Sequence, residues 1–104
     1  MLNKELLMMG GEVTSGTLTL NYYAEDDGYI QLRNVLTGEI VFYAGVSGNM
    51  HTETIPVNIG DRLALGFPEF FIESVYDMVG LSFSTGIFTV LENHASVNIH
   101  LMLN

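Results

Sequence analysis

The sequence contains no cysteine and no tryptophan, and its only basic residues are Lys4, Arg33 and Arg62. Without cysteine, the fold has no disulfide framework and the protein has no thiol chemistry. A nucleic-acid backbone and an anionic lipid surface each require several cations on one face, which three scattered basic residues cannot supply. We therefore expect neither nucleic acid nor a membrane among its partners.

Long apolar runs are also missing. None approaches the roughly 18–20 residues of a membrane span, and residues 1–9 form too short an apolar run for a signal peptide. We therefore expect cytoplasmic synthesis with no signal peptide or transmembrane segment. Because 48% of the 104 residues are hydrophobic, the chain should fold as one domain, with a net charge of −9.

The clearest structural signal is the strict alternation at the end of the chain. A period of two predicts a β-strand, with one face made of Val97, Ile99, Leu101 and Leu103 and the other of Ser96, Asn98, His100 and Met102. Residues 87–91 predict a preceding strand, joined to it by a hairpin at 92–94. Glu92 is the only formally charged residue from 78 to 104, so this stretch must lie inside a sheet or under a partner.

Further strands are expected at 17–23, 29–35, 39–46, 52–59 and 62–67. Asp27-Gly28 and Leu36-Thr37-Gly38 predict hairpin turns, and Pro56 predicts an edge strand because it lacks a backbone donor. Residues 68–79 fit either a helix or a strand, and we favour a strand with an irregular break near 73–77.

These patterns predict an all-β protein, an antiparallel β-sandwich of seven to eight strands that is jelly-roll-like or Ig-like. The sandwich should comprise residues 12–104, after an N-terminal arm of residues 1–11. Leu2, Leu6 and Met9 would share one side of a short helix in that arm. Such an arm can pack on its own domain or dock on a neighbouring subunit.

No motif points to catalysis, a metal or a cofactor. Glu25-Asp26-Asp27 lacks calcium-loop spacing. The histidines and one nearby carboxylate are scattered through the chain, at His51, Glu53, His94 and His100. Ser47 resembles the nucleophile-elbow serine, but Asn49 stands where that motif needs glycine. We expect a protein that is not an enzyme.

Tyrosines offer an alternative function. Tyr22, Tyr23 and Tyr29 could stack on sugar rings as the surface of a carbohydrate-binding module. They could equally form cross-strand pairs within a sheet, which we favour because tryptophan is missing.

In its size, its lack of cysteine and its layout of apolar arm and sandwich, the chain resembles small β-sandwich proteins of bacteriophage virions. These serve as capsid decoration, head-fibre or tail components. The resemblance implies a non-enzymatic structural protein that forms a symmetric homo-oligomer, such as a trimer, and binds other virion proteins. On this hypothesis Leu2, Leu6, Met9, Asn98, His100 and Met102 form interfaces, and the protein moves from the cytoplasm into the virion.

Overall fold

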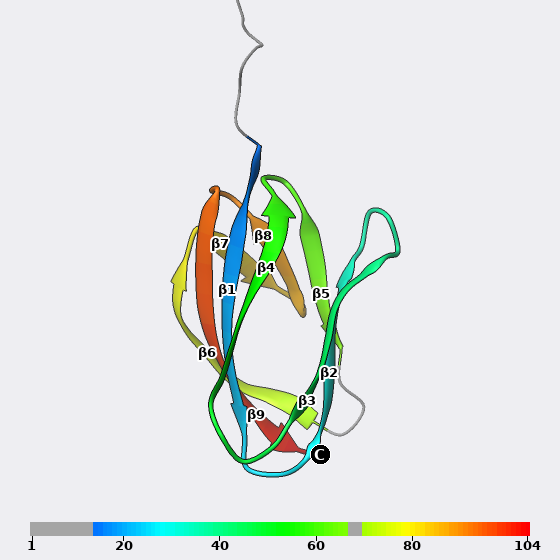
Figure 1. The fold of residues 1–104 in the computed structure, drawn as a ribbon, viewed down its shortest axis with the longest axis vertical. Coiled ribbons are helices and arrows are strands. Elements are labelled where there is room, and N and C mark those ends of the chain that lie inside the picture. The colour runs from blue at the N-terminus through cyan, green and yellow to red at the C-terminus, as the bar shows by residue number, and fades with distance from the viewer. Residues whose placement is uncertain (1–13, 67–69) are drawn as a thin grey trace, which may run out of the picture.

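The computed structural model describes residues 14–66 and 70–104, which form an all-β sandwich (Figure 1). The predicted fold class is therefore confirmed. The strands are β1 (Ser15–Ala24), β2 (Gly28–Asn34), β3 (Ile40–Val46), β4 (His51–Asn58), β5 (Arg62–Gly66), β6 (Phe70–Val79), β7 (Leu81–Ser84), β8 (Ile87–Val90) and β9 (His94–Leu103). The described residues thus hold nine strands rather than seven or eight. The short strand β7 was not expected; a tight turn at Thr85 and Gly86, both with positive φ, joins it to β8.

The strands form a four-stranded sheet in the order β4-β1-β9-β6 and a five-stranded sheet in the order β3-β2-β5-β8-β7. Every pairing is antiparallel except that between β1 and β9, which run parallel. Strand β9 lies between β1 and β6, and β8 lies between β5 and β7. The two strands predicted in the nearly chargeless stretch are therefore central in their sheets, as predicted. Strand β7 and the end of β6, which belong to the same stretch, lie at sheet edges.

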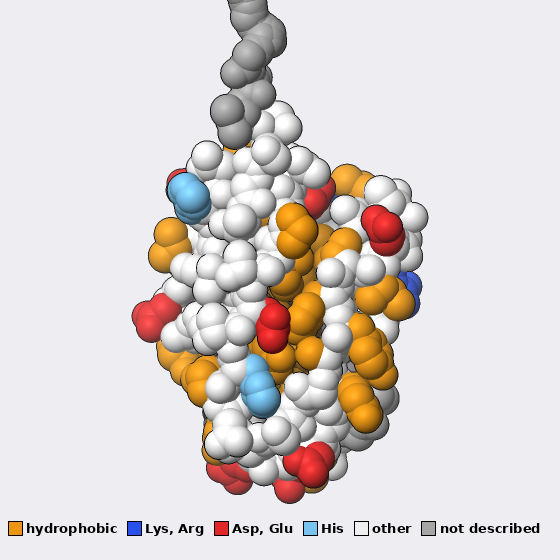
Figure 2. All heavy atoms as spheres, in the orientation of Figure 1, with side chains coloured by type: hydrophobic (Ala, Val, Ile, Leu, Met, Phe, Trp, Pro, Cys, Tyr) orange, Lys and Arg blue, Asp and Glu red, His pale blue; other side chains and the backbone are white. Residues whose placement is uncertain are grey.

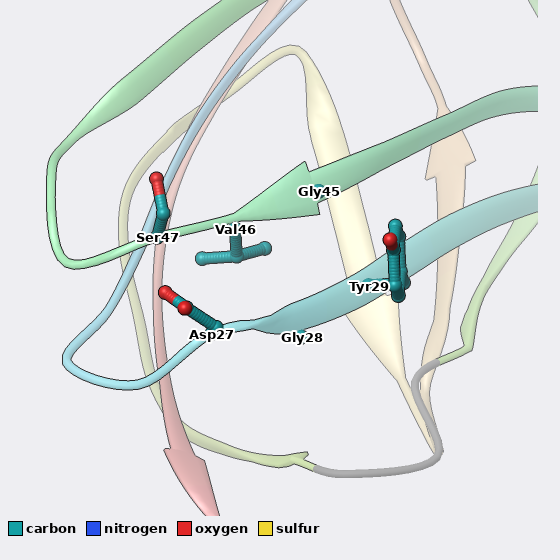
Figure 3. Close-up of a pocket in the computed structure, with 6 residues that line it drawn as sticks. All are labelled: Asp27, Gly28, Tyr29, Gly45, Val46 and Ser47. Atoms are coloured by element: carbon teal, nitrogen blue, oxygen red, sulfur yellow. The ribbon is translucent and has the colours of Figure 1, made fainter.

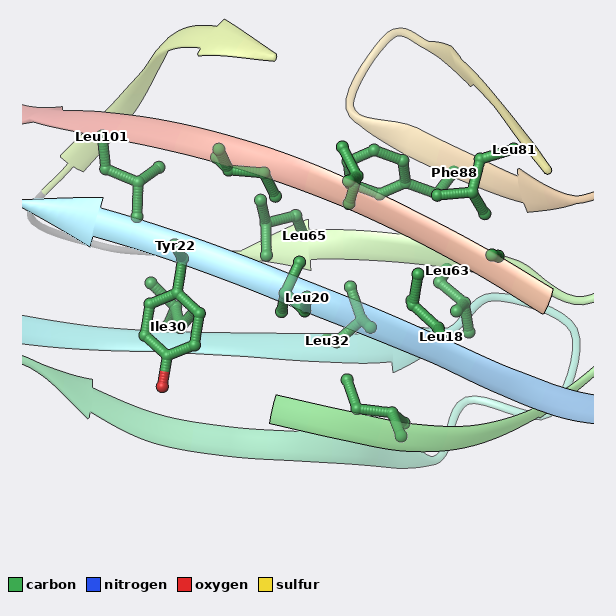
Figure 4. Close-up of a cluster of buried hydrophobic side chains, with 14 of the residues drawn as sticks. Leu18, Leu20, Tyr22, Ile30, Leu32, Leu63, Leu65, Leu81, Phe88 and Leu101 are labelled. Atoms are coloured by element: carbon green, nitrogen blue, oxygen red, sulfur yellow. The ribbon is translucent and has the colours of Figure 1, made fainter. Parts of the chain in front are cut away.

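The core lies between the sheets and follows the alternation of the strands (Figure 4). On β9, Val97, Ile99 and Leu101 are buried as expected, because residues two apart point to the same face. On β1, Leu18 and Leu20 have no exposed surface. Leu103 follows the same alternation, but its side chain is 46% exposed because it is the last residue of the strand.

Two predicted hairpins are wrong. The turn around Asp27-Gly28 leads from β1 to β2 in the other sheet, and residues 91–93 likewise lead from β8 to β9 in the opposite sheet. Both connections arch across the sandwich instead of folding one strand onto the next. The carbonyl of Asn93 accepts a hydrogen bond of 3.0 Å from the amide of Thr17, which fixes the start of β9 beside β1.

Three other local predictions are confirmed. Strands β2 and β3 form the hairpin predicted from Leu36-Thr37-Gly38, with Gly38 at a φ of 78°. Strand β4, which contains Pro56, is an edge strand. Residues 70–79 form strand β6, whose pairing with β9 is irregular between Ile72 and Ser74 and again between Tyr76 and Val79.

The predicted arm, with Leu2, Leu6 and Met9, lies outside the described residues. The structure therefore leaves the expected boundary near residue 11 as a prediction. In the part of the chain that is described, no helix could span a bilayer.

Candidate functional site

The outer surface of the four-stranded sheet carries no formal charge over three adjacent strands, β4, β1 and β9. The alternation that buries the core residues points polar side chains outward on the same strands. We call this surface the neutral face; it consists of Thr52, Thr54, Pro56, Thr17, Thr19, Asn21, Tyr23, Ser96, Asn98 and His100. Figure 2 shows one side of the molecule, where an acidic side chain stands near the centre and hydrophobic groups gather between β4 and β3.

Cross-strand hydrogen bonds hold the neutral face together. The hydroxyl of Thr52 donates to Oδ1 of Asn21 at 2.7 Å, and Nδ2 of Asn21 donates to Oδ1 of Asn98 at 2.9 Å. This chain of contacts links β4, β1 and β9. Because these polar groups are already partnered within the sheet, less hydrogen bonding to water would be lost if another surface covered them.

His100 lies at the border between the neutral face and β6. Its Nδ1 is 3.0 Å from Oε1 of Glu73, and its ring lies against that of Tyr23 with 5.3 Å between the centroids. Its Nε2 is buried and has no hydrogen-bond partner among the described residues. One ring nitrogen is therefore engaged by Glu73 and the other is buried within the sheet surface.

An apolar strip adjoins the neutral face along the edge strand β6. Phe71 pairs with Met102, Tyr76 with Asn98 and Val79 with Ser96, so these side chains project from the same face of the sheet. Phe71, Tyr76, Val79 and Met102 are all exposed. We call these four residues the apolar strip. The Glu73 carboxylate, paired with His100, lies within the strip, and Asp77 is exposed in the irregular stretch between Tyr76 and Val79.

The predicted interface residues on β9 therefore lie on one surface. Asn98 and His100 belong to the neutral face, and Met102 belongs to the adjoining strip. Sequence alternation placed all three on the non-core side. It missed the apolar partners Phe71, Tyr76 and Val79, because the irregular pairing of β6 decides which of its residues face outward.

The structure does not bring the three candidate sugar-binding tyrosines together. Tyr22 is buried, with 1% of its surface exposed. It points to the inner face of the sheet, as Leu18 and Leu20 do, because residues two apart on a strand face the same way. Tyr23 belongs to the neutral face, while Tyr29 projects from the other sheet. The idea of one surface formed by all three tyrosines was therefore wrong.

Tyr29 borders a separate depression at one end of the β2–β3 hairpin. This hollow of about 330 Å³ is lined by Asp27, Gly28, Tyr29, Gly45, Val46 and Ser47 (Figure 3). We call it the Tyr29 hollow. Sequence reasoning missed the hollow, because Gly45 lies directly opposite Tyr29 only through the register of the hairpin, which shifts between Leu32 and Arg33.

The histidines are spread over the molecule. His51 stacks on the ring of Tyr22, with 5.2 Å between centroids and 17° between ring planes, while His94 begins β9. Across residues 14–66 and 70–104, no three His, Cys, Asp or Glu residues are grouped so that they could hold a metal ion.

Comparison with known proteins gave no match to a protein family, a curated protein or a solved structure.

Proposed function

We propose that the protein is a non-enzymatic structural subunit that forms a homo-oligomer through the neutral face and the apolar strip. The observation that carries this proposal is the uncharged outer surface of β4, β1 and β9 in a chain of net charge −9. Under this proposal the oligomer is part of a bacteriophage virion, as the resemblance in size and layout implies, and it contacts other virion proteins there.

Electrostatics and solvation both favour this surface for contact between copies. Two subunits of the same charge repel each other, and burying a carboxylate without a partner is costly. On β4, β1 and β9 no carboxylate belongs to the neutral face, because Glu53 of β4 pairs with the inward-facing Leu20. Contact that includes the apolar strip also covers Glu73, whose carboxylate is already paired with His100. The apolar strip supplies the hydrophobic contribution, at about 25 cal/mol for each Å² of apolar surface removed from solvent.

The contacts of His100 favour a structural role over an enzymatic one. A general base needs an accessible nitrogen within hydrogen-bond reach of a substrate proton. In His100, one ring nitrogen contacts Glu73 and the other is buried. The pair therefore supports the order of the sheet surface rather than proton transfer.

The test is the mass of the protein in solution, measured by sedimentation for the wild type, Met102→Lys and Ser82→Lys. Met102 is 44% exposed, so a lysine there reaches solvent in the monomer and places a charge in the proposed interface. Ser82 is exposed on β7 in the other sheet, so Ser82→Lys changes the net charge equally and serves as the matched control.

We expect an oligomer for the wild type and Ser82→Lys, and a smaller species for Met102→Lys with an unchanged β-type circular-dichroism spectrum. A monomeric wild type would overturn the proposal. An oligomer that tolerates Met102→Lys but is disrupted by Ser82→Lys would move the interface to the five-stranded sheet.

A further inference from the structure

The Tyr29 hollow lies on the sheet opposite the proposed interface and has features of a small ligand site. We propose that it binds a neutral pyranose, with one face of the sugar ring against Tyr29 and its hydroxyl groups directed to Asp27 and Ser47. Its volume of about 330 Å³ lies near the lower end of the roughly 300–1,000 Å³ range of small-molecule pockets, which suits a single sugar unit.

The aromatic wall of the hollow is held in place by a second tyrosine. The rings of Tyr29 and Tyr43 are stacked, with 5.6 Å between centroids and 18° between planes. Tyr43 pairs with Gln31, which is two residues after Tyr29 on β2. Tyr43 therefore lies on the side of Tyr29 that is away from Gly28. Tyr43 therefore covers one face of the Tyr29 ring, and the other face borders the hollow. Aromatic faces carry negative charge density, which attracts the C–H groups on the apolar face of a pyranose.

The floor of the hollow contains two glycines on neighbouring strands, one residue apart in the register of the hairpin. Gly45 pairs with Tyr29, and Gly28 pairs with Val46, whose side chain is buried in the core. A Cβ atom at Gly45 would lie 3.8 Å from the ring of Tyr29, in ordinary contact with it. Gly45 thus leaves open the space beside the ring that any larger side chain would occupy.

The polar groups lie at the end of the hollow away from Tyr29. Figure 3 shows Asp27 and Ser47 there, with Gly28 and Gly45 between them and the ring. A carboxylate accepts hydrogen bonds and a serine hydroxyl can donate or accept, so together they match vicinal sugar hydroxyls. Asp27 continues the acidic loop of Glu25 and Asp26, which disfavours phosphorylated or acidic ligands.

A quaternary ammonium group is the main competing ligand, since a cation is also attracted to an aromatic face and a carboxylate. The hollow favours the sugar because, among the residues that the structure describes, its lining contains one aromatic ring, that of Tyr29, rather than a cage. Tetramethylammonium therefore serves as the competing probe.

The experiment is a titration of ¹⁵N-labelled protein, followed by amide chemical shifts, with the methyl glycosides of glucose, galactose, mannose and N-acetylglucosamine. We expect at least one of them to shift the amides of residues 27–29 and 45–47 with millimolar affinity. Tyr29→Ala should weaken that binding about tenfold, which corresponds to the binding free energy contributed by one aromatic contact. Gly45→Val should abolish it by filling the floor of the hollow.

Leu36→Ala is the matched control, because it removes an exposed apolar side chain at the turn of the same hairpin, away from both the hollow and the proposed interface, and should leave sugar binding unchanged. Folding of each variant is checked by the dispersion of its own spectrum. The proposal is overturned if no glycoside shifts these amides, if Tyr29→Ala binds as well as wild type, or if only tetramethylammonium binds. The wild-type oligomer mass is measured separately, so failure of either proposal is distinguishable from failure of the other.

Discussion

Tyr22 is the clearest case of a single residue whose chemistry is set by the fold. Its ring is buried, stacks on His51 and meets Phe42 edge-on at 6.0 Å. Burial raises the pKa of the Tyr22 hydroxyl above its ordinary value of 10.0, and the negative charge of Glu53 raises it further. The folded protein therefore holds this proton more tightly than the unfolded chain does.

The sign of the pH dependence follows. Below pH 10 both states keep the proton, and the full stability is present. Above it the unfolded chain ionises first, so stability falls as pH rises through the folded pKa. We expect Tyr22→Phe to lose less stability than wild type between about pH 9 and about pH 11, measured by urea unfolding at each pH. The other tyrosines are the same in wild type and in Tyr22→Phe. If the two proteins lose stability equally with pH, the pKa of Tyr22 is the same in the folded and unfolded states.

Gly80 shows how a second residue constrains the chain at a single point. It has a φ of 69°, and a Cβ there would lie 2.5 Å from the carbonyl oxygen of His94. Gly38 has a similar φ of 78°, but an added Cβ would meet nothing within 4 Å. The two positions thus separate backbone strain from close packing.

Gly38→Ala should cost roughly 1–2 kcal/mol of unfolding free energy, the ordinary penalty for a side chain in the left-handed region. Gly80→Ala should cost more, by about 1–3 kcal/mol, because β9 must also shift to make room. Chemical denaturation of both variants measures the difference. Equal losses would show that the chain relaxes freely around residue 80.

At the scale of elements, β9 is the strand on which the four-stranded sheet depends. It pairs with β1 on one side and β6 on the other, and its inward residues are buried. Ile99→Ala should destabilise the fold by about 2–5 kcal/mol, because it leaves a cavity in the core. Leu103 follows the same alternation on the same strand but is half exposed, so Leu103→Ala should lower the free energy of unfolding by less than about 1 kcal/mol. Thermal unfolding of both proteins checks this, and similar losses would show that the end of β9 is packed in solution.

Sequence patterns predicted individual strands better than their connections. Alternation correctly identified the inward residues of β9, and Pro56 correctly marked an edge. The same alternation indicated that Tyr22 faces the core with Leu18 and Leu20, so its placement on a binding surface was an avoidable error. Turn residues such as Asp27-Gly28 allow the chain to reverse, but they do not decide whether the next strand joins the same sheet or crosses to the other one. That choice depends on core packing between strands distant in sequence.

The candidate sites were predictable only in part, for the same reason. The outward residues of β9 follow from a period of two, but the neutral face needs β4 and β1 beside it. The parallel pairing of β1 with β9 joins residues 77 positions apart, Asn21 and Asn98. The Tyr29 hollow depends on the register that places Gly45 opposite Tyr29. A register shift of one residue would turn the side chains of the neutral face and of the Tyr29 hollow to the opposite faces of their sheets.

At the scale of the whole molecule, net charge gives a test of how copies associate. At a net charge of −9, two copies of the protein repel each other, and salt screens that repulsion over about 10 Å at 0.1 M. If contact is made through the neutral face, added sodium chloride should shift the protein toward the oligomer and raise its melting temperature. Sedimentation and thermal melts over a salt series measure both effects. An oligomer that dissociates as salt is added would instead be held by ion pairs.

The parallel pairing of β1 and β9 also determines how the molecule responds to tension. Strand β1 starts at the upper end of the molecule in Figure 1, and the chain ends at the lower end, after β9. A pull on Ser15 and Leu103 therefore acts lengthwise along two adjacent strands, and their hydrogen bonds are loaded together in shear rather than opened one after another. Forced unfolding should occur in one step at high force, because its rate depends on breaking the whole β1–β9 ladder at once. We therefore expect the folded protein to carry a lengthwise tensile load up to that force without unfolding.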